Sequence, residues 1–78
     1  MKLGDYYDQK YQELLNRLRT ARLESGLTQE QVAQELGKNQ SFVSRSETGD
    51  RRIDVIELQA FADIYQKSMS YFLSLGEN

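Results

Sequence analysis

Apolar residues recur at three- and four-residue spacing along most of the chain, and no stretch keeps the alternation typical of a strand. The first stripe consists of Tyr11, Leu14, Leu15, Leu18 and Ala21. It predicts a helix that begins at Asp5 or Asp8, either of which could cap it, and that ends near Ser25.

Two shorter helical patterns follow, with a glycine between them. Thr28 and Gln31 form a capping-box pattern for a second helix, which ends at Gly37. Its inner face consists of Val32, Ala33 and Leu36. Asn39 is suited to cap a third helix over residues 40–48. Helices this short are not stable alone in water, so they must pack against the rest of the chain.

The pattern continues to the end of the chain. Asp54 is suited to cap a fourth helix. Its apolar positions are Val55, Ile56, Leu58, Phe61, Ala62 and Tyr65. Ser68 or Ser70 opens a short last helix, and residues 76–78 are expected to fray. That helix carries Met69, Tyr71, Phe72, Leu73 and Leu75. The whole pattern predicts an all-α fold in a single domain over residues 1–78.

The composition excludes several kinds of chemistry. The 78 residues include no cysteine and no histidine, so thiolate and imidazole metal sites and a histidine general base are excluded. We therefore expect no metal, no cofactor and no enzymatic activity. The N-terminus lacks the apolar run of a signal peptide, and no apolar stretch is long enough to cross a membrane. These features favour a cytoplasmic protein without a membrane partner.

The net charge of −2 hides an asymmetry. Residues 38–52 hold four basic and two acidic side chains, a net charge of +2, which leaves −4 for the rest of the chain. A basic patch on an acidic body can bind phosphate in one orientation while the body repels contacts in others.

The second and third predicted helices and the short turn between them form a helix-turn-helix pattern. Four signals occur in order: T-Q-E at the start of the second helix, L-G in the turn, Q-S at the start of the third helix and E-x-G at its end. Residues 14–73 therefore resemble the Cro/repressor-type helix-turn-helix proteins of the XRE family. The resemblance implies a compact five-helix bundle of the lambda-repressor-like DNA-binding type, with residues 28–48 as its helix-turn-helix core. It also implies double-stranded DNA as the partner.

The third helix is expected to read base edges in the major groove, which admits one helix. Its outward face carries Gln40, Ser41, Ser44 and Arg45. Gln pairs well with adenine and Arg with guanine. The resemblance places Gln40, Ser41 and Arg45 where the family reads bases, although Gln40 and Ser41 could also be ordinary polar residues of a helix start. Val43 should point into the core, and we expect Phe42 to pack between helices rather than touch a thymine methyl group.

Phosphate contacts are expected around the same motif. The candidates are Gln29, Lys38, Asn39, Arg51 and Arg52. The resemblance implies that Gln29 contacts a phosphate and braces Gln40. A plain exposed glutamine and a solvated charged loop are the alternative interpretations.

The resemblance further implies a partly buried ion pair between Arg22 and Glu47, which would fix the angle of the third helix. Ser46 departs from the family pattern, which has a large apolar residue there. A neighbour such as Phe42 or Phe61 could fill the space, or the helix could be loose. We expect Arg22→Ala to weaken folding and DNA binding, and Ser46→Tyr or Ser46→Ile to raise the melting temperature.

The apolar last helix could close the core or pair with a second copy of the chain. By resemblance, a homodimer would form through Met69, Tyr71, Phe72 and Leu73. Tyr6, Tyr7 and Tyr11 could join that contact. The function expected is a sequence-specific DNA-binding transcriptional regulator, a small dimeric repressor that reads an inverted repeat. The alternative is an antitoxin-like module that binds a protein partner. No small-molecule ligand is evident.

Overall fold

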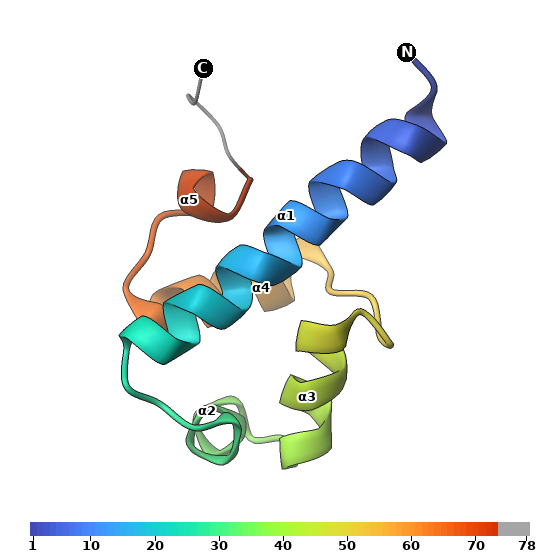
Figure 1. Cartoon of the computed structure of the whole chain (residues 1–78). Helices are drawn as coiled ribbons and strands as arrows, with labels where there is room; N and C mark the ends of the chain where they lie inside the picture. Colours follow the sequence, from blue (N-terminus) through green and yellow to red (C-terminus); the bar gives the residue numbers. More distant parts are fainter. Residues whose placement is uncertain (74–78) are drawn as a thin grey trace.

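The computed structural model describes residues 1–73, which form five α-helices and no strand (Figure 1). They are α1 Leu3–Glu24, α2 Gln29–Leu36, α3 Gln40–Thr48, α4 Val55–Tyr65 and α5 Met69–Leu73. The all-α prediction is confirmed. Leu75 and residues 76–78, for which we expected a helical residue and a frayed end, lie outside the described residues.

The starts of α2, α3 and α4 were readable from the sequence. Thr28 Oγ1 accepts a hydrogen bond from the backbone N–H of Gln31 at 3.1 Å, and Gln31 Oε1 accepts from the N–H of Thr28 at 2.9 Å. Asn39 Oδ1 accepts from the N–H of Phe42 at 3.1 Å. Asp54 caps α4 in the same way. Each side chain satisfies an N–H group that the first helical turn would otherwise leave unpaired.

The predicted start of α1 was wrong. The helix begins at Leu3, before both expected caps, and Lys2 at the capping position makes no side-chain hydrogen bond. Asp5 lies inside the first turn, where its negative charge is favourable beside the positive end of the helix dipole. Because Asp5 stabilises the helix from within, its position in the sequence did not mark the boundary.

The core lies where α1 crosses the other helices. Its members are Leu14, Leu18, Ala21, Val32, Ala33, Val43, Leu58, Phe61, Ala62, Tyr65 and Phe72. Two of the apolar positions expected in α4 do not belong to it, because Val55 and Ile56 in the first turn are 65% and 69% exposed. Within α4, the buried residues begin only at Leu58.

The turn between α2 and α3 depends on one glycine. Gly37 has φ of 68°, a left-handed conformation that favours glycine. Its chain neighbour Lys38 donates its backbone N–H to the carbonyl of Ala33 at 2.9 Å, which closes α2 before α3 begins.

Among the described residues, no helix combines the length and apolar character that a membrane span requires.

Candidate nucleic-acid interface

One face of α3 is exposed and the opposite face is buried. Gln40, Ser41 and Arg45 are exposed, and Ser44 is partly buried. Val43 is fully buried in the core, as predicted. The structure therefore gathers the expected base-reading side chains on the outer side of a helix whose other side is fixed in the protein interior.

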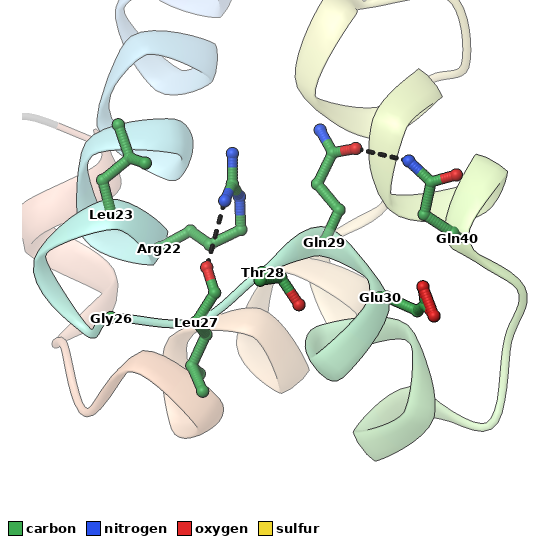
Figure 2. Close-up of a pocket in the computed structure, with 8 residues that line it drawn as sticks. All are labelled: Arg22, Leu23, Gly26, Leu27, Thr28, Gln29, Glu30 and Gln40. Carbon is green, nitrogen blue, oxygen red and sulfur yellow. Dashed lines mark hydrogen bonds between the residues drawn. The ribbon is translucent and has the colours of Figure 1, made fainter.

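Gln29 links the two helices of the motif. Gln40 Nε2 donates a hydrogen bond to Gln29 Oε1 at 2.7 Å, and Gln29 Nε2 donates to Glu47 Oε1 at 3.0 Å. Figure 2 shows the side chains of Gln29 and Gln40 pointing toward one another from α2 and α3. One side chain at the start of α2 therefore contacts residues at both ends of α3.

Arg22 and Glu47 lie in contact beneath this link. Arg22 Nε is 2.6 Å from Glu47 Oε2, and a second guanidinium nitrogen is 3.2 Å from Oε1. The side chains are 11% and 4% exposed. The hydrogen bond to Glu47 raises the pKa of Arg22, against the opposing effect of burial. Arg22 also donates to the carbonyl oxygen of Leu27 at 3.0 Å, so the pair joins α1, the α1–α2 turn and α3 (Figure 2).

An open hollow of about 590 Å³ lies beside the linked glutamines (Figure 2). It is lined by Arg22, Leu23, Gly26, Leu27, Thr28, Gln29, Glu30 and Gln40. The first turn of α2 borders it, and a helix start offers backbone N–H groups and a positive dipole end. Residues 1–73 contain no group of three or more His, Cys, Asp or Glu side chains that could hold a metal ion.

Arg51 occupies the space beside Ser46. The guanidinium carbon of Arg51 lies 4.2 Å from the ring centroid of Phe42, and its two terminal nitrogens each donate to Glu57 at 3.0 Å. One of them is also 3.3 Å from Ser46 Oγ, which itself donates to the carbonyl oxygen of Phe42 at 2.7 Å. The bonds to Arg51 are the main cause of the lowered pKa of Glu57. Sequence reasoning did not single out Glu57, and the structure shows that it serves both the capping box of α4 and the contact with Arg51.

Arg52 contacts α1 instead. It donates to Tyr7 Oη at 3.0 Å, and its guanidinium carbon is 5.0 Å and 4.9 Å from the ring centroids of Tyr7 and Tyr11. Lys38 is exposed, with its ammonium 5.3 Å from the Phe42 ring centroid. Asn39 is used as the cap of α3. The five expected phosphate contacts therefore differ in how much of their hydrogen-bonding capacity is used inside the chain.

The residues expected to form a dimer contact do not share one exposed surface. Phe72 is 1% exposed and belongs to the core, so its prediction as a contact with a second copy was wrong. Phe72 is part of the core, and its helix α5 contacts α1 and α4. Met69 and Tyr71 are partly buried, and Arg17 donates to the carbonyl oxygen of Tyr71 at 2.8 Å. Leu73 is 41% exposed.

Comparison with known proteins agrees with this geometry. Residues 18–72 match the family described as Helix-turn-helix. The fold is similar to a solved structure titled XRE-family like protein from Pseudomonas syringae pv. tomato str. DC3000, with a TM-score of 0.85 and 39% sequence identity. That match covers 92% of this chain and 88% of the other. Among proteins with curated descriptions, none matches significantly.

Proposed function

Since the chain belongs to the XRE-type helix-turn-helix family of DNA-binding regulators, we propose that it is a small dimeric repressor that reads an inverted repeat. In this proposal α3 lies in the major groove of double-stranded DNA. Residues 1–78 act as one helix-turn-helix DNA-binding unit in the cytoplasm, with a binding role rather than a catalytic one.

The observation that carries the proposal is the hydrogen bond between Gln40 and Gln29. Gln40 gives one of its two amide N–H groups to Gln29. Its other N–H group and its oxygen remain for adenine N7 and N6, the two-pronged contact that this side chain makes best. Because the side chain is already held in one orientation, binding loses less rotamer entropy.

The other base contacts come from the same face. Arg45 is exposed farther along α3, and a guanidinium binds guanine O6 and N7 in a two-pronged manner. Ser41 and Ser44 have short side chains whose hydroxyl groups can hydrogen-bond to several bases, so they select less strongly between them. We propose that these four residues of α3 read each half-site.

Phosphates are proposed to lie on both sides of this face. Gln29 and the start of α2 border the hollow where one phosphate would accept hydrogen bonds. Lys38 and Asn39, at the turn between α2 and α3, would contact a second phosphate. Arg52 would contact a third phosphate if its hydrogen bond to Tyr7 were replaced by one to the phosphate. For Arg51 we propose a positioning role instead, because Glu57, Phe42 and Ser46 surround its guanidinium.

Selection of bound duplexes from a random library at moderate salt, followed by sequencing, tests the proposal. We expect an inverted repeat with half-site centres about 10 base pairs apart. Gln40→Ala and Arg45→Ala should each relax one position of the half-site and weaken binding by about 1–3 kcal/mol. Gln34→Ala, on the exposed side of α2, is the matched control and should select the same sequence. A pool that stays random would contradict the proposal and direct the search to a protein partner.

A further inference from the structure

Two tyrosines of α1 hold the loop between α3 and α4. Arg52 Nη1 donates a hydrogen bond to Tyr7 Oη at 3.0 Å. The backbone N–H of the next residue, Ile53, donates to Tyr11 Oη, also at 3.0 Å. Tyr7 and Tyr11 are about one helical turn apart, and their rings stack with centroids 5.5 Å apart and planes at 9° to one another. We call these two side chains the tyrosine pair.

The guanidinium of Arg52 contacts both rings of the tyrosine pair. Its central carbon is 5.0 Å and 4.9 Å from the two ring centroids, within the range of cation–π attraction. Arg52 and Tyr7 are both exposed, so a phosphate can approach the guanidinium from solvent. The tyrosine pair therefore sets where this cation, one of the proposed phosphate contacts, lies before DNA binds.

The two hydroxyl groups hold different parts of the loop. The Tyr7 hydroxyl holds a side chain, and an uncharged hydroxyl is a weaker acceptor for a guanidinium than a charged phosphate oxygen. The Tyr11 hydroxyl holds the backbone at Ile53, which is partly buried, so loss of that acceptor costs free energy. A phosphate can therefore replace the first hydrogen bond, whereas loss of the second would loosen the loop.

We propose that the tyrosine pair controls the phosphate contact of Arg52. The Tyr7 hydroxyl restrains the guanidinium and opposes DNA binding, whereas the Tyr11 hydroxyl fixes the loop and favours it. This inference rests on the proposed DNA-binding function and adds two residues of α1 to it. Both precede residue 18, where the match to the helix-turn-helix family begins. They are positioning residues, because they act through Arg52 and its loop rather than by touching DNA.

The same substitution at the two positions tests these opposite roles, because Tyr7→Phe and Tyr11→Phe each remove one hydroxyl and keep the ring. The full chain is titrated against a duplex selected from the library, with fluorescence anisotropy as the readout. Tyr7→Phe should bind about threefold more tightly, because the phosphate no longer competes with a hydroxyl for Arg52. Tyr11→Phe should bind about threefold more weakly and melt at a lower temperature, because the N–H of Ile53 loses its acceptor. Tyr6→Phe, at an exposed position of α1, is the control and should change neither quantity.

A double-mutant cycle tests whether Tyr7 acts through Arg52. Arg52→Met should weaken binding and reduce the slope of log affinity against log salt concentration by about one, the value for one phosphate contact. Adding Tyr7→Phe to Arg52→Met should leave the affinity of Arg52→Met unchanged, because the hydroxyl then has no guanidinium to restrain. A general effect of Tyr7 on the fold would instead add to the effect of Arg52→Met.

Several results would overturn the inference. An unchanged or weaker affinity for Tyr7→Phe, an additive cycle, or an unchanged salt slope for Arg52→Met contradicts the restraint by Tyr7. Wild-type affinity for Tyr11→Phe contradicts the role of the second hydroxyl. These results leave the proposed function intact as long as the wild-type chain selects an inverted repeat. A random pool from the wild-type selection would instead remove the proposed function, and this inference with it.

Discussion

Arg51 takes the place of a large apolar side chain beside α3. Ser46 is fully buried, yet a serine fills little volume, and the guanidinium of Arg51 covers the Phe42 ring next to it. The hydroxyl of Ser46 bonds back to the carbonyl of Phe42, which satisfies the buried polar group. Of the two possibilities left open by the sequence, a filled space is the one found, and an arginine from the following turn fills it.

This packing reverses the expectation for Ser46. Ser46→Tyr must displace Arg51 from Phe42 and separate it from Glu57, because the site has no exposed room. We expect a destabilisation of about 1–3 kcal/mol, the usual cost of overpacking, measured as a lower melting temperature. Thr48→Tyr, on the exposed side of α3, is the control and should change the melting temperature little. A higher melting temperature for Ser46→Tyr would show that the site accepts the ring.

Tyr65 carries the one buried side-chain polar atom that lacks a hydrogen-bond partner within residues 1–73. The residue is 4% exposed, and burial raises the pKa of its hydroxyl, so the group stays neutral in ordinary buffers. An unpaired buried hydroxyl costs about 1–3 kcal/mol. Tyr65→Phe should therefore raise the melting temperature, whereas Tyr6→Phe, at an exposed position of α1, should not. A fall for Tyr65→Phe would indicate a buried water bound to the hydroxyl.

At the scale of elements, a chain of hydrogen bonds connects α1, α2 and α3. It runs from Arg22 through Glu47 and Gln29 to Gln40. Arg22 is on α1, so the core helix is connected through polar contacts to the side chain proposed to read bases. A change at Arg22 should therefore reach the DNA without any direct contact between them.

Arg22→Ala tests that connection. It leaves Glu47, which is 4% exposed, without its cation, and breaking such a buried pair typically costs about 3–5 kcal/mol. We expect a lower melting temperature in thermal unfolding and weaker binding in a gel-shift assay at a temperature where the variant is still folded. Arg19→Ala, exposed on the same helix, is the control. Unchanged melting and unchanged affinity would show that the pair does not hold α3.

The helix boundaries show where local sequence suffices. The starts of α2, α3 and α4 were predicted because each depends on a side chain that bonds its own backbone nearby. The start of α1 was missed because no side chain caps it. Val55 and Ile56 were predicted to face the core because they are hydrophobic. They are exposed, because contacts with the other helices decide which face of α4 is buried.

At the scale of the whole molecule, the helix-turn-helix motif could be predicted from the sequence. The side-chain contacts that hold α2 and α3 against the rest of the chain could be predicted only in part. The resemblance implied the contacts of Arg22 with Glu47 and of Gln29 with Gln40. The contacts of Arg51 with Phe42 and of Arg52 with Tyr7 join segments whose relation is set by the packed bundle, and no local pattern indicates them. The sequence left open whether the last helix closes the core or pairs with a second copy, and the burial of Phe72 places that residue in the core.

The salt dependence of DNA binding distinguishes a cation that contacts phosphate from one that positions α3. Each phosphate contact contributes about one unit to the slope of log affinity against log salt concentration. Lys38→Met should therefore reduce the slope by about one and leave the melting temperature nearly unchanged, because Lys38 is exposed. Arg51→Met should lower the melting temperature and leave the slope unchanged, because its guanidinium is bound to Glu57. A reduced slope with unchanged melting for Arg51→Met would instead make Arg51 a phosphate contact, and the space beside Ser46 would then need another explanation.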